Sequence, residues 1–429
     1  MKSFQIILIT IFVLIAVASV MVFAFTGTGS QQVTPKATVW GTFTSSDFLQ
    51  LLSNINSGGP TIEVNYQQHD PKKIDAEFVN ALAEGTGPDI IIYPDNKFIS
   101  YRSKIYNIPY KNFPERTYLD AFLDASNVFL GKDGVWAVPF MVDPLVMYWN
   151  KATFTGAGLA VPPKKWSELE GLSQKLIVKN SVGGISKAMV PLGEFRNITN
   201  AKDILTTLIF QANNPISAPG IDRDEVTYVV DQQGGDYGNV IPVVGYYTSF
   251  SNPSSPMYTW NRSFPNSTDA FSSGDTAIYF GKASELRDIR ARNPNLYFDV
   301  ALVPQSDNNN KNTVKSTLYL MSIVKNSKNI AGAFAVLNYL TNSDSQAFWS
   351  GISGLPPARR ELLSGSATDP FQAIFYKAAV QSETWLDPNA DLSSTAFQDM
   401  IESVTTGKQQ ANEVVTPFAS RLSNIYQGK

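Results

Sequence analysis

The sequence contains no cysteine and a single histidine, His69, among its 429 residues. The lack of cysteine excludes disulfide bonds, thiolate zinc sites, a thiol nucleophile and anchoring through a lipidated cysteine. One histidine cannot supply a multi-histidine metal site, and a Ser-His-Asp triad would have to use His69. Charge is also scarce: charged residues make up 17% of the chain and the net charge is -3. No basic surface for nucleic acid is therefore expected.

The composition is that of a large globular protein, with 43% hydrophobic residues. A chain of this length exceeds what one hydrophobic core normally organises, so we expect two lobes. Nothing in the sequence indicates a cofactor or a resident metal ion, and none is predicted.

Residues 4–25 form an apolar run that only three polar residues interrupt. As a helix this run would be about 33 Å long, enough to span a bilayer. Lys2 precedes it, which favours a cytoplasmic N-terminus and an extracytoplasmic body. The run is either an uncleaved signal anchor or a signal peptide cut after Ala18; its continuation past Ala18 favours the anchor. Residues 26–36 are small and polar and are predicted to be a flexible linker.

Apolar strands alternate with helical segments in the N-terminal part of the body. The predicted order is strand 37–40, helix 45–55, strand 61–66, helix 74–82 and strand 89–93. This alternation predicts an α/β lobe with a largely parallel sheet, in which ligands lie beyond the carboxyl ends of the strands. Further strands are predicted at 137–139, 145–149, 276–280 and 298–303, and helices at 166–175, 205–211, 271–273, 331–340 and 396–405.

Six segments, taken in order, resemble the sugar-type extracellular solute-binding proteins, the family that includes maltose-binding protein. They are residues 83–91 (AEGTGPDII), 145–151 (LVMYWNK), 162–169 (PPKKWSEL), 271–278 (FSSGDTAI), 300–304 (VALVP) and the helical segment 331–343. The resemblance covers nearly the whole chain from residue 37 onward. Each segment alone is a weak signal, but six in the order of the family are specific.

The resemblance implies a two-lobed periplasmic-binding-protein-like fold of type II, with hinge strands that cross between two α/β lobes. Lobe one would comprise residues 37–143 and 299–342, and lobe two residues 144–298 and 343–429. The implied function is capture of a small solute, expected to be a sugar, by lobe closure outside the cytoplasm, with delivery to the permease subunits of an ABC importer. The implied protein is not an enzyme.

The residues leave three alternatives open. A surface sensor or adhesin could share the same fold. A carbohydrate-active enzyme would need two carboxylates beside the scissile bond, for example Asp143 with Asp95 or Glu194. The adjacent tyrosines Tyr246 and Tyr247 resemble the ferric-ion ligands of related binding proteins, since hard oxygen ligands suit that ion.

Sugar sites combine aromatic faces with polar groups that pair with hydroxyls. The resemblance implies that Tyr93, Asn96 and Lys97, which follow the strand 89–93, face the cleft. Asp143, at the first crossing, would accept sugar hydroxyls, and Trp385 would add an aromatic face. The alternatives are structural: Tyr93 could pack the end of the sheet, Asp143 could form a turn before Pro144, and a tryptophan could anchor its loop.

Further candidate ligand contacts are Trp260, Tyr247, Glu194 and Tyr279. One departure from the family matters. Where sugar binders commonly carry a cleft tryptophan after Gly281, this chain has Lys282-Ala283-Ser284. We expect Tyr279 or Trp260 to compensate; if neither does, the ligand differs from a maltodextrin.

Overall fold

The computed structural model describes residues 34–58, 61–220, 222–228, 240–307, 311–365, 367 and 369–428. The predicted helix 4–25 and most of the linker 26–36 lie outside these residues. Among the described residues, no helix is both long enough and apolar enough to cross a bilayer.

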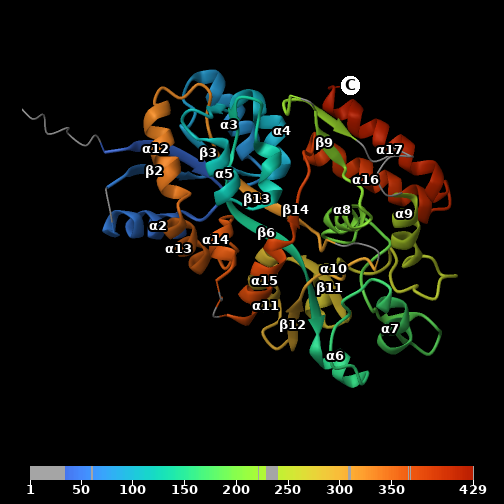
Figure 1. Ribbon diagram of the computed structural model, residues 1–429. Helices are drawn as coiled ribbons and strands as arrows, with labels where there is room; N and C mark the ends of the chain where they lie inside the picture. Colours follow the sequence, from blue (N-terminus) through green and yellow to red (C-terminus); the bar gives the residue numbers. More distant parts are fainter. Residues whose placement is uncertain are drawn as a thin grey trace, which may run out of the picture.

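Five strands form the first region of the sheet, in the order β2-β1-β3-β13-β6 (Figure 1). β1 (Lys36–Gly41) pairs in parallel with β2 (Glu63–Gln68) and β3 (Ile90–Pro94). The connections are α2 (Ser45–Gly58) and α3 (Ile74–Glu84), which confirms the predicted alternation. β13 (Val314–Ile323) is antiparallel to β3 and to β6 (Val138–Asn150).

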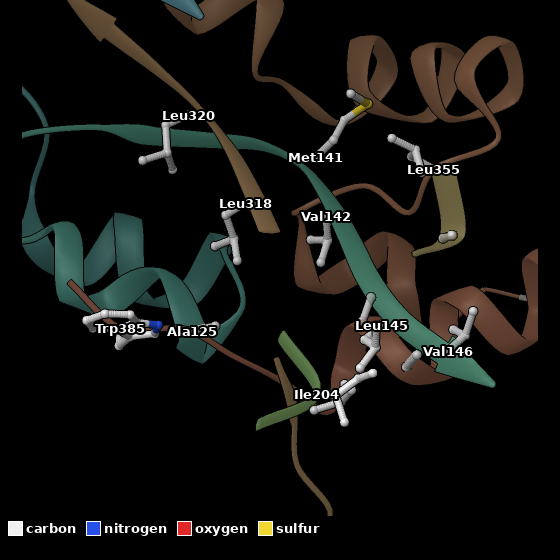
Figure 2. Close-up of a cluster of buried hydrophobic side chains, with 14 of the residues drawn as sticks. Ala125, Met141, Val142, Leu145, Val146, Ile204, Leu318, Leu320, Leu355 and Trp385 are labelled. Atoms are coloured by element: carbon white, nitrogen blue, oxygen red, sulfur yellow. The ribbon is translucent and has the colours of Figure 1, made fainter. Parts of the chain in front are cut away.

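The long strand β6 joins this region to a second one. Its residues 138–144 pair with β13, and its residues 145–150 pair with β11 (Ile278–Lys282) and β12 (Phe298–Ala301), both antiparallel. The prediction of two separate strands around Asp143 and Pro144 is therefore wrong. Proline lacks the N–H that a strand interior needs. Pro144 is tolerated because it lies where β6 changes partners, between the residues labelled Val142 and Leu145 in Figure 2.

Helices cover both regions of the sheet. The predicted helices near 166, 205, 271, 331 and 396 are all present, with bounds that differ by a few residues. The helices not yet given are α4 (Phe98–Tyr101), α5 (Glu115–Ala121), α6 (Lys151–Gly156), α7 (Glu168–Leu176), α8 (Ala201–Gln211), α9 (Val240–Ser249), α10 (Ser267–Ser273), α11 (Leu286–Arg292), α12 (Ile330–Leu340), α13 (Ser343–Ser353), α14 (Arg360–Leu363), α15 (Pro370–Val380), α16 (Ala390–Thr405) and α17 (Ala411–Tyr426).

Short elements complete the described fold. The strands are β4 (Ile108–Pro109), β5 (Gly134–Val135), β7 (Val178–Lys179), β8 (Ile185–Lys187), β9 (Ser217–Pro219), β10 (Val226–Tyr228) and β14 (Ser382–Glu383), which is parallel to β13. The 3-10 turns are η1 (Asp95–Lys97), η2 (Arg102–Lys104), η3 (Asp124–Phe129) and η4 (Ala283–Glu285).

An aromatic cluster fastens α13 to the first region. Trp349 on α13 is buried against Phe48 on α2 and against Phe43 and Phe140, with ring centroids 5.2–5.8 Å apart. Rings at this spacing and tilt stabilise a core beyond their apolar area. Helix α13, which begins at Ser343, therefore packs on the first region.

Candidate functional site

A polar cavity of about 240 Å³ lies between the two regions. Asp95 and Asn96 in η1, with Lys315 and Thr317 on β13, line it from the first region. The opposite wall includes Lys202 and Asp203 on α8, Lys282 at the end of β11, Trp385, Asp387, and Asp391 and Ser394 on α16. Trp385 is the aromatic residue of this lining.

Local structure explains why these side chains meet. η1 begins where β3 ends, at the edge where the carboxyl ends of β1, β2 and β3 gather and where α/β sheets commonly bind ligands. On the other wall, the side chain of Asn389 accepts the backbone N–H groups of Asp391 and Leu392 and so caps α16. The cap starts that helix beside the cavity.

Three lysine–aspartate pairs organise the charge of the cavity. Lys315 Nζ lies 2.9 Å from Asp95 Oδ2, Lys202 Nζ lies 2.6 Å from Asp387 Oδ2, and Lys282 Nζ lies 3.0 Å from Asp203 Oδ2. The first pair is almost completely buried, with side chains 7% and 2% exposed. A buried charge persists only with a partner, so each lysine is held in place by its own carboxylate.

The pKa shifts in the third pair agree with this arrangement. Burial alone would raise the pKa of Asp203, but the charges of Lys282 and Lys315 bring it below its usual value. Burial alone would lower the pKa of Lys282, but Asp203 and Asp143 raise it above its usual value. Both groups are therefore ionised at neutral pH.

Asp143 lies beside Lys282 but does not line the cavity. Its carboxylate accepts the backbone N–H of Ser284 at 2.9 Å and the hydroxyl of Ser284 at 2.7 Å. Since the nearest lysine is paired with Asp203, burial dominates and raises the pKa of Asp143 to about 6, although Lys282 and Ser284 lower it. Asp143 thus secures the start of η4 rather than the cavity wall.

This shift predicts a pH dependence of stability. The folded-state pKa of Asp143 lies above its usual value of 3.8, so the ionised form is disfavoured in the folded protein. The folded state therefore binds the proton more tightly, and stability falls as the pH rises from about 4 to above 6. We expect wild type to lose about 3 kcal/mol relative to Asp143→Asn across this window. Guanidinium denaturation of both proteins at several pH values checks this, and a pH-independent difference contradicts it.

Of the five residues expected to converge on one cleft, Asn96 and Trp385 line the cavity. Tyr93 does not: it is still paired within the sheet, buried, and its hydroxyl lies 2.8 Å from that of Ser322. Lys97 pairs with Asp75 at 2.5 Å on the side of α3. The first region contributes Asp95 to the cavity lining, and not Tyr93 or Lys97.

The four further candidates lie in the packing of the second region. Trp260 stacks on Phe264 and donates to Asn197, Tyr247 donates to the carbonyl of Glu194, Glu194 pairs with Arg262, and Tyr279 donates to Glu285. None of the four is among the residues that line the cavity. Tyr279 and Trp260 therefore contribute no aromatic face to this cavity.

The adjacent tyrosines use their hydroxyls on backbone carbonyls. Tyr246 donates to the carbonyl of Trp166 at 3.1 Å, and Tyr247 donates to that of Glu194 at 2.6 Å. Burial raises the pKa of both phenols above the usual value, which disfavours the phenolate form that a ferric ion needs. This arrangement suits packing of α9.

The three cavity lysines and Asp387 were not predicted as site residues from the sequence. One signal was available: Lys315 stands in the strand sequence VKSTLYLMSI, where a lysine facing the core needs a buried partner. Lys202 gave no such signal, because a lysine near the start of an amphipathic helix is usually solvated. The partners of these lysines lie on elements that are up to 220 residues away in the chain, which local sequence does not reveal.

A second set of contacts joins the two regions at the hairpin of β9 and β10. Between these strands, Asp224 accepts from Arg102 Nη2 at 2.6 Å and from Trp136 Nε1 at 3.2 Å. Arg223 pairs with Glu115 at 2.5 Å, and Asp222 lies 3.3 Å from Lys132 Nζ. The hairpin therefore carries charged contacts from the second region onto the first.

Comparison with known proteins assigns the chain to a family. The model of the bacterial extracellular solute-binding protein family matches residues 45–347. No match is found among curated proteins.

Solved structures share the two-lobed fold. The cyclic α-maltosyl-1,6-maltose binding protein of Arthrobacter globiformis has a TM-score of 0.74 at 16% identity, covering 92% of this chain and 100% of its own. A cyclo/maltodextrin-binding protein complexed with maltotetraose has a TM-score of 0.72 at 14% identity, with 93% and 99% covered. An ABC transporter solute-binding protein of Thermotoga lettingae bound with α-D-tagatose has a TM-score of 0.64 at 19% identity, with 92% and 100% covered. The chain belongs to the family of bacterial extracellular solute-binding proteins.

Proposed function

We propose that this protein captures a small sugar in the cavity between its lobes and delivers it to the permease subunits of an ABC importer. The observation that carries the proposal is the polar cavity, to which both regions contribute charged and amide side chains together with Trp385. The similar structures from Arthrobacter globiformis and Thermotoga lettingae are described as a sugar-binding protein and a sugar complex. A cavity of about 240 Å³ is smaller than the roughly 300–1,000 Å³ of most drug-sized ligand pockets, which favours one or two sugar rings.

Lobe closure would follow from the position of this cavity. A ligand that touches Asn96 on one side and Trp385 on the other gains contacts only when the lobes are together. Such differential contacts shift the population toward the closed form. The ion pairs of the β9–β10 hairpin with Arg102 and Glu115 support the same closed arrangement.

For the lobe boundaries we propose a modified division of the chain. The change of partner in β6 after Pro144 supports a boundary near residue 143. The pairing of β12 with β6 and the bridge between Lys165 and Gln305 favour a second boundary after residue 305, before β13 begins. The packing of α13 on Phe43 and Phe48, and the bridge between Phe122 and Arg359, favour placing residues 343–363 in lobe one. The final crossing would then lie near α15 and β14.

We propose that the protein acts outside the cytoplasm, held at the membrane by residues 4–25 and the linker 26–36. The apolar run and Lys2 support this topology. The N-terminal sequence of the protein isolated from cells tests it, because a mature chain beginning at Ser19 means cleavage instead of anchoring.

We also propose that the protein catalyses no reaction. The carboxylates considered for glycoside hydrolysis do not form a pair in the cavity: Asp95 bonds to Lys315, while Asp143, bonded to Ser284, and Glu194, paired with Arg262, do not line it. Incubation with oligosaccharides should give no shortened products, and their appearance would contradict this part of the proposal.

A thermal-shift screen of the full-length protein in detergent tests the proposed function. The ligands are mono- and disaccharides, with amino acids and ferric ion as alternative classes. A sugar present at 100 times its dissociation constant is expected to stabilise the folded protein by about 2.7 kcal/mol. The proposal is contradicted if no sugar raises the melting temperature while a member of another class does.

A further inference from the structure

The hydrogen-bonding capacity of the cavity lysines is largely used by the protein itself. An ammonium group has three N–H donors. Lys315 Nζ has three acceptors within 3.0 Å: Asp95 Oδ2 at 2.9 Å, Thr384 Oγ1 at 3.0 Å and the carbonyl of Ser316 at 2.5 Å. No N–H of Lys315 is left for a ligand.

The lysines of the opposite wall are similarly engaged. Lys202 Nζ donates to Asp387 Oδ2 at 2.6 Å, to Ser393 Oγ at 2.6 Å and to the carbonyl of Ala390 at 3.3 Å. Lys282 Nζ contacts Asp203 at 3.0 Å and Thr317 Oγ1 at 3.0 Å, which accounts for two of its donors. An anionic ligand would therefore meet lysines whose N–H donors, apart from one on Lys282, already have acceptors within the protein.

On the wall formed by the first region, the buried polar atoms that lack a hydrogen-bond partner are acceptors. Asp95 Oδ1 and Asn96 Oδ1 are buried and have no hydrogen-bond partner among the described residues, while Asp95 Oδ2 is held by Lys315 and Thr384. Asp95 is 2% exposed. Buried acceptors without partners are costly, so two neighbouring acceptors at a cavity wall favour a ligand that donates hydrogen bonds.

The charge balance leads to the same conclusion. The cavity lining contains four aspartates and three lysines, which leaves one negative charge in excess. The excess charge is on Asp391, since the other three aspartates each have a lysine partner. An added carboxylate or phosphate would add to this excess and would lose its hydration, and the three lysines could offer it only the third N–H of Lys282.

We propose that this site selects uncharged, hydroxyl-rich sugars and rejects their anionic derivatives, with Asp95 Oδ1 and Asn96 Oδ1 as the acceptors that decide. This inference rests on the proposed sugar-binding function and adds the charge class of the ligand. The sugar hydroxyls donate to the two oxygens, and the contacts of Asp95 Oδ2 with Lys315 and Thr384 keep Asp95 in place.

Matched sugar sets test the selection by calorimetry on the full-length protein. Each set contains a neutral hexose, its uronic acid and its 6-phosphate, for glucose and for galactose. In the set that binds, the neutral sugar is expected to bind about 100-fold tighter or more than either anion. Equal or tighter binding of an anion overturns the inference while leaving the sugar-binding function intact. If these sets and the disaccharides of the thermal-shift screen all fail to bind, the proposed function fails and the inference with it.

Two variants of Asn96 distinguish the loss of this hydrogen-bond acceptor from a general effect on packing. Asn96→Ala removes one acceptor and should weaken the neutral sugar about 3- to 10-fold without improving the anions. Asn96→Lys places a donor and a positive charge at the same position, and should shift the preference toward the uronic acid by about tenfold or more relative to Asn96→Ala. An unchanged preference in both folded variants would contradict a deciding role for this oxygen.

Discussion

Replacing Lys315 by methionine is expected to lower the free energy of unfolding by about 3–5 kcal/mol. Lys315 and Asp95 have side chains that are 7% and 2% exposed, and their charged atoms lie 2.9 Å apart. Methionine fills the space of the lysine stem but leaves the carboxylate of Asp95 buried without a counter-ion. Guanidinium denaturation followed by tryptophan fluorescence measures the loss.

The double variant Lys315→Met with Asp95→Asn is the matched control. It removes both charges together, so most of the lost stability should return, because a neutral amide costs far less to bury than a lone carboxylate. A single variant as stable as wild type, or a double variant no better than the single one, would show that this pair does not hold the cavity wall together.

Filling the cavity is expected to abolish sugar binding. Ser394 is half-buried on α16 and lines the cavity. The tryptophan of Ser394→Trp would occupy much of the roughly 240 Å³ and exclude a sugar ring. Affinity should fall about 1,000-fold or more, a change of roughly 4 kcal/mol. Calorimetry with the sugar found in the thermal-shift screen measures it.

The control for the cavity-filling variant is Ser394→Ala, which removes the hydroxyl and leaves the cavity open. It should bind within about threefold of wild type, and both variants should keep the circular dichroism spectrum of the folded protein. A folded Ser394→Trp protein that binds the sugar as tightly as wild type would place the ligand elsewhere.

Local patterns predicted the order of elements well in the first region. Turn residues such as Gly85 and Pro88 separate apolar segments whose lengths suit a helix or a strand, and the structure has α3 and β3 on either side of them. The fold implied by the resemblance also agrees with the family match and the similar structures. These predictions succeeded because strand and helix identity depends mainly on short-range pattern.

The side chains of the cavity were harder to predict because they depend on long-range pairing. An aromatic residue at the end of an apolar strand, such as Tyr93, can face a cleft or pack inside the sheet; the partner strand β13 keeps it inside. Asp143 was expected to meet the ligand, but Ser284, 141 residues later, takes both of its oxygens. Lys315 and Asp95 are 220 residues apart, and no local pattern couples them.

One sugar is proposed to bind between the lobes, in the cavity formed by η1, β13, α8 and α16. A crystal structure of the full-length protein with the sugar from the thermal-shift screen tests it most directly. We expect one sugar molecule in this cavity, with hydroxyls donating to Asp95 Oδ1 and Asn96 Oδ1 and with contact to Trp385. A sugar bound at another place, with these three residues untouched, would contradict it.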